Sequence, residues 1–278
     1  MAIRMIAIDV DGTLLDSRWQ VPEQNRRAIG EAAERGIEVA LVTGRRFDFV
    51  REVAEQLPGE LALIVNNGAL IKSKDGTTHL RNLLPREVAR QVLEATPQFR
   101  SGTAVVFDRP QASQVVFEKI DWNDPGRKGY LDRNRAYLAE VSPLETALDE
   151  DPIQVMFTGP VEPMREVVAI LRTIADKRFA LAVTEYEQRN FTIVDAIRHG
   201  CSKGTSLKEW AQRRGIFRQE VMAIGDNWND REMLEFAGLP VVMGNAAAEL
   251  KSRGWTVTLS NDQNGVAAAI RTYALGHS

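Results

Sequence analysis

The sequence predicts an α/β fold in which a mostly parallel sheet is interrupted by an inserted α+β module. Three observations predict it. Short aliphatic runs that end in polar turns alternate with amphipathic helical stretches near both ends of the chain. Between these parts, hairpin signals and mixed strands and helices break the alternation. The 278 residues are enough for one large domain or two modest ones.

The first strand is predicted at Met5–Ile8, where an apolar run precedes Asp9 and Asp11, and Gly12 ends it. Alternation along a strand would point Asp9 and Asp11 to the same side. Two carboxylates that face one way at the end of a buried strand are costly unless a cation or a reaction needs them. The alternative is a strand end whose acids only cap the next turn.

Helix and strand then alternate twice more. A helix is predicted at Pro22–Arg35, since proline suits the first helical turn and Gly36 suits the stop. The next elements are a strand at Ile37–Val42 ending in Thr43-Gly44-Arg45, a helix at Phe47–Leu57, and a strand at Leu61–Val65 ending in Asn66-Asn67-Gly68. This βαβ order predicts parallel strands, so their polar carboxyl ends should meet at one edge, where ligands bind.

The inserted α+β module is predicted at 83–189, between core segments 1–82 and 190–278. One helix and one strand already fill the stretch from Asp9 to Thr43, whereas the stretch from Thr43 to Lys203 is far longer than a βαβ unit needs. The elements expected there, after a hairpin around Lys74–Thr77, are a helix at Pro85–Ala95, antiparallel strands at Thr103–Phe107 and Val115–Phe117, a loop at Asp121–Asn134, a strand at Ile153–Thr158, a helix at Val161–Ala175 and a strand at Ala180–Thr184.

The parallel pattern is expected to resume near Phe191. Its predicted elements are helices at Lys203–Arg214, Asn229–Phe236, Ala247–Arg253 and Gly265–Ala274, and strands at Val221–Ile224, Leu239–Met243 and Thr256–Leu259.

Composition narrows the class of protein. The net charge of −3 gives no general attraction to nucleic acid or to anionic membranes. The single cysteine, Cys201, excludes an internal disulfide and fits a reducing compartment. No apolar run approaches the roughly 20 residues that span a bilayer, so a cytoplasmic protein is predicted. The sequence leaves the oligomeric state open.

Several motifs now stand in order along the chain. They are Asp-Val-Asp-Gly-Thr-Leu-Leu from Asp9, Thr43-Gly44-Arg45, Ser202-Lys203-Gly204, Gly-Asp-Asn-Trp-Asn-Asp from Gly225, Met-Gly-Asn-Ala from Met243, Asn66-Asn67-Gly68-Ala69 and Ser260–Val266. In these motifs the chain resembles the haloacid dehalogenase (HAD) superfamily, and within it the Cof-type phosphatases with a second-class cap. The resemblance covers the core and implies a Rossmann-like parallel sheet; the insertion matches by length and position only.

The chemistry of phosphate esters supports the resemblance independently. Phosphate monoesters hydrolyse very slowly, so an enzyme must position an in-line nucleophile and neutralise the phosphoryl oxygens. A carboxylate can be that nucleophile and divide hydrolysis into two steps through an aspartyl-phosphate. It cannot approach a phosphate dianion without a cation, and Mg²⁺ held by one or two carboxylates fills that need. The expected partner is a small phosphorylated metabolite, with sugar phosphates, nucleotides and phosphorylated cofactors all open.

The resemblance implies a role for each motif residue. Asp9 would attack phosphorus, and Asp11 would act as general acid and then general base. The implied Mg²⁺ ligands are Asp9, Asp226 and the backbone carbonyl of Asp11, with Asp230 close behind and in a position to orient Lys203. The implied phosphate contacts are the Thr43 hydroxyl, the Gly44 backbone N–H, the Lys203 ammonium and Asn229, and more weakly Arg45, Asn67 and Gly68. Asn245 and Asn261 are expected to support the site.

Each residue also has an ordinary alternative. Thr43 could be a plain helix cap, Lys203 a solvated charge, and Arg45 the partner of an acid. At the level of function, the rivals are a phosphotransferase or phosphomutase of the same fold, and a non-catalytic phosphometabolite-binding protein. The last should have lost Asp9, Asp11 or Lys203.

Some residues lie outside the motif pattern. Trp228 and Asp195 depart from the family's usual residues. Trp228 would either line the substrate entrance or pack against the surface of the module, and a cap contact at Asp195 is in doubt. The histidines are expected at the surface: His79, His199 and His277. Four polar or aromatic residues of the insertion are weak candidates for substrate contacts: Arg109, Trp122, Lys128 and Arg189.

Overall fold

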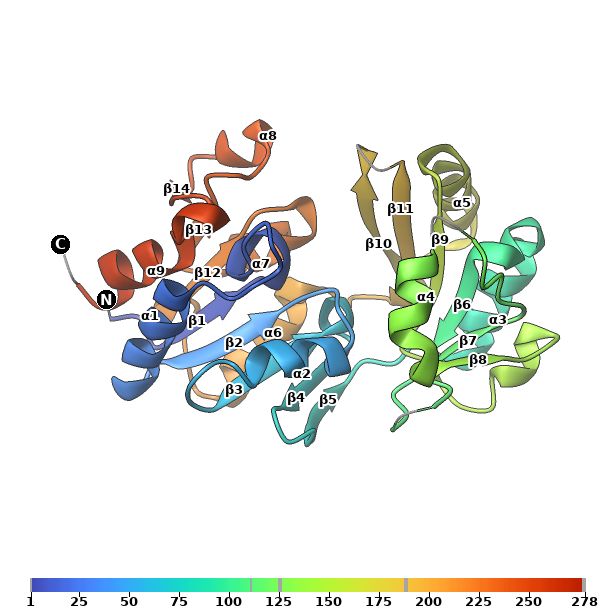
Figure 1. Ribbon diagram of the computed structural model, residues 1–278, viewed down its shortest axis with the longest axis horizontal. Coiled ribbons are helices and arrows are strands. Elements are labelled where there is room, and N and C mark those ends of the chain that lie inside the picture. The colour runs from blue at the N-terminus through green and yellow to red at the C-terminus, as the bar shows by residue number, and fades with distance from the viewer. Residues whose placement is uncertain (1, 111, 125–126, 188–189, 277–278) are drawn as a thin grey trace. The chain divides into compact units, whose positions relative to one another are not determined.

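The structure is a computed structural model that describes residues 2–110, 112–124, 127–187 and 190–276. The chain forms two compact units (Figure 1). Unit 1 comprises Met1–Arg81 and Cys201–Ser278, and unit 2 comprises Asn82–Gly200. The insertion therefore begins close to its predicted start but extends beyond its predicted end at 189.

Unit 1 is built on an eight-stranded sheet. In spatial order its strands are β14 (Thr256–Val257), β13 (Leu239–Val242), β12 (Val221–Gly225), β1 (Met5–Ile8), β2 (Glu38–Val42), β3 (Leu61–Val65), β4 (Leu70–Ser73) and β5 (Thr78–Arg81). The pairs from β14 to β3 are parallel, and the β3–β4 and β4–β5 pairs are antiparallel. This confirms the predicted parallel core.

Helices pack on both faces of this sheet because its central strands are apolar throughout. The helices are α1 (Glu23–Glu34), α2 (Phe47–Ala54), α6 (Lys203–Arg213), α7 (Arg231–Phe236), α8 (Ala248–Lys251) and α9 (Gly265–Ala269). Leu207 and Met233 from α6 and α7 join Ala7 and Val42 of the sheet in one buried cluster. Helix α1 packs on β2 and α9, and its Asn25 accepts a 3.0 Å hydrogen bond from the Ala267 amide. Strand β1 is thereby buried on both sides, which fixes the position of the residues that follow it.

Unit 2 is a six-stranded sheet, and two of its helices pack on one face of that sheet. In spatial order its strands are β10 (Phe179–Tyr186), β11 (Phe191–Arg198), β9 (Gln154–Gly159), β6 (Thr103–Val106), β7 (Val115–Phe117) and β8 (Leu138–Glu140), and its helices are α3 (Arg86–Ala95), α4 (Lys128–Asn134) and α5 (Val161–Ile174). Leu93 and Val167 from α3 and α5 pack on Val155 and Val194. The predicted α+β content of the insertion is confirmed.

Two sequence-based predictions are wrong in unit 2. Phe191–Arg198 does not resume the parallel sheet; it pairs antiparallel with both β9 and β10. Residues Lys128–Asn134, predicted as loop, form α4, because Leu131 is buried and Lys128 pairs with Asp132 one turn later at 3.2 Å. The short strand β8, which pairs parallel with β7, was not predicted at all.

Within the described residues, no helix combines the length and the apolar character needed to cross a membrane.

Candidate active site

Three functional motifs begin where neighbouring parallel strands end. Asp9 follows β1, Thr43 follows β2 and Asp226 follows β12. The Asp9 amide donates to the Ile224 carbonyl at 3.0 Å, so pairing between β1 and β12 continues up to the site. The structure therefore gathers these motifs at the carboxyl edge of the sheet, as the sequence predicts.

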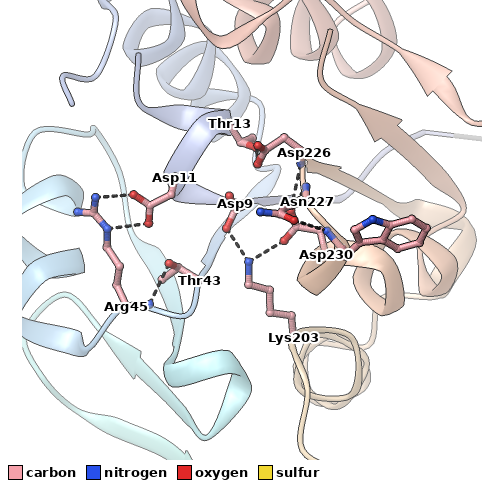
Figure 2. A network of polar contacts seen from close by, with 10 residues as sticks. Asp9, Asp11, Thr13, Thr43, Arg45, Lys203, Asp226, Asn227 and Asp230 are labelled. Carbon is pink, nitrogen blue, oxygen red and sulfur yellow. Dashed lines mark hydrogen bonds and ion pairs between the residues drawn. The ribbon is translucent and has the colours of Figure 1, made fainter. Parts of the chain in front are cut away.

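Lys203 connects two of the acids. Its side chain is 2% exposed, and its Nζ lies 2.6 Å from Asp9 Oδ1 and 2.6 Å from Asp230 Oδ1 (Figure 2). The residue begins helix α6, whose first turn is fixed by a capping box between Ser202 and Thr205. Burial lowers the pKa of Lys203, but the two carboxylates outweigh burial and raise it above the ordinary value. The side chain is therefore a charged ammonium at any physiological pH.

Asp230 links Lys203 to the loop that carries Asp226. Its Oδ2 accepts hydrogen bonds from the backbone amides of Asp226 at 3.0 Å and of Asn227 at 3.1 Å (Figure 2). A Cβ added at Gly225 would lie 2.7 Å from Asp230, so only glycine allows this approach. Both oxygens of Asp230 are thus engaged, which agrees with the predicted role of orienting Lys203.

Asp226 is held against the loop that follows Asp9. Its Oδ1 accepts a 3.1 Å hydrogen bond from the Thr13 hydroxyl. A Cβ at Gly12 would lie 2.5 Å from Asp226 Oδ2, and the φ of +77° at Gly12 also favours glycine. Thr13 is a site residue that the sequence analysis missed, although it lies directly within the first motif.

The acids at this edge carry more negative charge than Lys203 can balance. Asp9, Asp226 and Asp230 each offer a carboxylate oxygen, and these atoms lie within 4.8 Å of one another. Burial, reinforced by Asp230, raises the pKa of Asp9 well above its usual value and that of Asp226 to about 7. A group of hard oxygen donors short of positive charge fits a divalent cation such as Mg²⁺ or Ca²⁺.

Asn229 supports the same interpretation. Its Oδ1 is buried, and among the described residues it has no hydrogen-bond partner. An unpaired buried oxygen is costly, so a bound ligand or water in the site would complete the arrangement.

Asp11 has a different partner from Asp9. Its carboxylate accepts two hydrogen bonds from Arg45, at 2.7 Å from Nε and 2.5 Å from Nη2 (Figure 2). Strand β1 ends at Ile8, and Asp11 lies in the irregular helical segment that follows, η1 (Val10–Leu14). Of the two alternatives for Arg45, the structure shows the acid partner.

The second strand end is arranged around Thr43. Thr43 is 1% exposed, and its Oγ1 accepts a 3.1 Å hydrogen bond from the Arg45 amide, which leaves the hydroxyl proton available to another acceptor. A Cβ at Gly44 would lie 3.0 Å from Asn67 Oδ1, so Gly44 and Asn67 are in close contact. The phosphate contacts expected of these residues stay predictions.

Gly68 positions the start of α6. It has a φ of +98°, and an added Cβ would lie 2.3 Å from the Ser202 carbonyl oxygen, while its own carbonyl accepts from Ser206 Oγ at 2.7 Å. This contact lies one residue before Lys203, so it fixes the start of α6.

We therefore expect Gly68→Ala to impair both folding and activity. The matched control is Gly76→Ala, where φ is +90° but the nearest side-chain atom to an added Cβ is 3.8 Å away. Gly76→Ala should cost about 1–3 kcal/mol of unfolding free energy with unchanged activity. Gly68→Ala should cost more and also lower kcat, as measured by denaturant unfolding and phosphate release. Equal effects of the two changes would show that the Ser202 contact is unimportant.

The remaining expectations fall outside the cluster. Asn245 donates to the Gly12 carbonyl at 2.9 Å and Asn261 to the Leu15 carbonyl at 3.0 Å, which agrees with supporting roles.

Asp195 lies in unit 2, where it accepts a 2.6 Å hydrogen bond from Gln154, and burial raises its pKa to about 7. His199 and His79 are both exposed, as expected, and the His79 ring also contacts Ser73 at 2.6 Å and packs near Trp210.

The weak candidates of the insertion have local partners. They are Arg109, paired with Asp149 and Glu150, Lys128, paired with Asp132, and Trp122, which stacks on Arg135. Arg189 and His277 lie outside the described residues.

A parallel α/β sheet that brings Asp9, Lys203 and Asp226 to one edge defines an α/β protein with an acidic site that could hold a divalent cation. The family model for haloacid dehalogenase-like hydrolases matches residues 6–270, and the chain belongs to this family. The resemblance seen in the motifs is confirmed.

Individual relatives match this chain over almost its whole length. Phosphatase YwpJ of Bacillus subtilis is 30% identical, covering 95% of this chain and 98% of its own. The 5-amino-6-(5-phospho-D-ribitylamino)uracil phosphatase YcsE of the same organism is also 30% identical, over 98% and 96%. Among solved structures, a haloacid dehalogenase-like hydrolase from Bacteroides thetaiotaomicron has a TM-score of 0.80 at 26% identity, covering 97% of this chain and 99% of its own.

Proposed function

We propose that the protein is a Mg²⁺-dependent phosphatase that hydrolyses a small phosphorylated metabolite through an aspartyl-phosphate on Asp9. The observation that carries this proposal is the Lys203 ammonium, held 2.6 Å from both Asp9 and Asp230 beside Asp226. Lys203 thereby orients the Asp9 carboxylate in a site where the carboxylates outnumber the cations. Family membership and relatives that are named phosphatases support the same chemistry.

The reaction has two steps. The Asp9 oxygen not bonded to Lys203 attacks phosphorus, the ester P–O bond breaks, and Asp11 gives a proton to the departing alcohol oxygen. A water molecule then attacks phosphorus while Asp11 takes its proton, which releases inorganic phosphate and restores Asp9. Asp11 must exchange its contact with Arg45 for one with the alcohol oxygen. Thr43, Gly44, Lys203 and Asn229 would hold the phosphoryl oxygens.

The metal would be held by residues already in place. Asp9, Asp226 and the Asp11 backbone carbonyl are the proposed Mg²⁺ ligands, and Mg²⁺ commonly binds one or two carboxylates together with substrate phosphate. When bound, it would supply the charge that lets a carboxylate approach a phosphate dianion. Asp230 stays with Lys203 because both of its oxygens already have partners.

Substrate choice is proposed to depend on unit 2, the insertion, and the protein is proposed to act in the cytoplasm. YcsE carries the name of a phosphatase for a phosphorylated ribityl-uracil, and other relatives carry the name HMP-PP phosphatase. These names agree with a small phosphorylated metabolite as the substrate. A non-catalytic binding protein is disfavoured because Asp9, Asp11 and Lys203 are all present.

A panel of phosphate esters tests this function. Sugar phosphates, nucleotides and phosphorylated cofactors are assayed for phosphate release with Mg²⁺ and with excess EDTA. We expect release that EDTA stops and that added Mg²⁺ restores. Turnover that survives EDTA in metal-free buffer would contradict the metal requirement. Transfer of phosphate to an added sugar in preference to water would identify a phosphotransferase or phosphomutase instead.

A further inference from the structure

Trp19 has an unusual backbone conformation in the loop that follows the first motif. Its φ of +63° lies in the left-handed region, which a bulky side chain rarely adopts. The residue is nevertheless 56% exposed. Burial in the core is therefore not what holds the indole in this position.

The loop is held by Asp16. Its Oδ1 accepts 2.9 Å hydrogen bonds from the amides of Arg18 and Gln20, while its backbone carbonyl accepts from the Trp19 amide at 3.0 Å. The hydrogen bonds to its carboxylate, with that from the Gln20 amide contributing most, lower the pKa of Asp16 below its ordinary value. The Ser17 amide is bonded to Asp262 at 2.8 Å. The loop thus fixes an exposed indole in a defined place.

That place adjoins the general acid. The Arg45 guanidinium carbon lies 5.3 Å from the centroid of the Trp19 ring, and the same guanidinium binds Asp11 through two hydrogen bonds. Side-chain exposure is 5% at Asp9 and 34% at Asp11, so the series Asp9, Asp11, Trp19 leads from the interior to the surface. Since Asp11 would protonate the alcohol oxygen, the groups beyond it flank the alcohol part of the substrate.

We propose that Trp19 and Arg45 form a subsite for the alcohol part of the substrate, which stacks a planar unsaturated ring on the indole. The inference rests on the proposed phosphatase function and narrows its substrate class to phosphate monoesters of alcohols that carry an aromatic or heteroaromatic ring. An indole and a guanidinium are both flat π-surfaces, and both stack preferentially on planar rings. A saturated ring offers C–H groups and no π-surface, so it packs less closely on the indole than a planar ring does.

Two esters of primary alcohols test the subsite: benzyl phosphate and cyclohexylmethyl phosphate, which match in size but differ in the planarity of the ring. The wild type and Trp19→Gly are compared by kcat/KM for each ester with Mg²⁺. Glycine accepts a positive φ without strain, so Trp19→Gly should fold at least as well as the wild type in thermal unfolding. Inhibition by inorganic phosphate should be unchanged, since the phosphate site retains all its residues.

We expect Trp19→Gly to lower kcat/KM for benzyl phosphate about tenfold, as loss of a stacking contact does, and to change that for cyclohexylmethyl phosphate less than twofold. Trp19→Phe should retain most of the preference for the aromatic ester. The control is Phe217→Leu. Phe217 is also aromatic and is 73% exposed, but it precedes β12 and so lies at the amino ends of the strands, opposite the site. It should affect neither ester.

Equal sensitivity of the two esters to Trp19→Gly, or no sensitivity of either, would overturn the subsite while leaving the phosphatase function intact. Failure of the wild type to release phosphate from any ester of the wider panel would instead contradict the proposed function itself. The two failures are therefore distinguishable in one set of assays.

Discussion

Asp9→Asn should abolish phosphate release, with kcat lowered by about 10⁴-fold or more, as expected when a covalent nucleophile is removed. The amide oxygen of asparagine can still accept the hydrogen bond from Lys203, so the site should keep its geometry. Because burial and neighbouring acids already raise the pKa of Asp9, a neutral side chain relieves repulsion. We therefore expect a variant that is inactive but at least as stable as the wild type.

Phosphate release measures the predicted loss of activity, and denaturant unfolding measures the predicted stability of Asp9→Asn. Asp48→Asn is the matched control, because Asp48 lies in the first turn of α2 and is not one of the clustered carboxylates. It should leave kcat unchanged. Substantial turnover by Asp9→Asn in the same assay would mean that another residue attacks phosphorus.

Lys203→Met should affect both activity and stability. The ammonium is 2% exposed and is the cation that Asp9 and Asp230 share. Removing it leaves buried carboxylates without their partner, at a cost of about 3–5 kcal/mol in unfolding free energy. The pKa of Lys203 is raised in the folded state, so its contribution is fully present at neutral pH and is lost only at strongly alkaline pH. The rate should fall by about 10²–10³-fold, since a charge that faces the phosphoryl group is gone.

Lys208→Met provides the control for this change. Lys208 lies on the same helix, α6, but is exposed, so its replacement should alter stability by no more than about 0.5 kcal/mol. The double variant Lys203→Met with Asp9→Asn should regain part of the lost stability, because one of the uncompensated charges is removed. A single variant Lys203→Met as stable as Lys208→Met would show that the ammonium does not balance these acids.

The parallel core could be predicted because its signals are local. The apolar run at Met5–Ile8 was predicted to be a buried strand, as it is. The polar residues at successive strand ends lie at one edge because βαβ units make the strands parallel. The meeting of Asp9, Lys203 and Asp230 follows from the same topology, since α6 begins at the site edge.

Features set by long-range contacts could not be read in the same way. Phe191–Arg198 has the apolar character of a core strand, and only its antiparallel neighbours β9 and β10 place it in unit 2. The contact between Arg45 and Asp11 depends on how the chain turns after Ile8, where Gly12 adopts a left-handed conformation. The exposed position of Trp19 likewise depends on hydrogen bonds that Asp16 accepts from the following backbone amides, which sequence spacing does not reveal.

The covalent intermediate itself is the most direct measurement. Enzyme mixed with Mg²⁺ and a substrate ester is quenched in acid during turnover, reduced with borohydride, and mapped by mass spectrometry. An acyl phosphate is reduced to the alcohol, so Asp9 should be found as homoserine, in amounts that depend on substrate and vanish without it. Homoserine at Asp11 or Asp226 in place of Asp9, or turnover with unmodified Asp9 under conditions in which the intermediate accumulates, would contradict attack by Asp9.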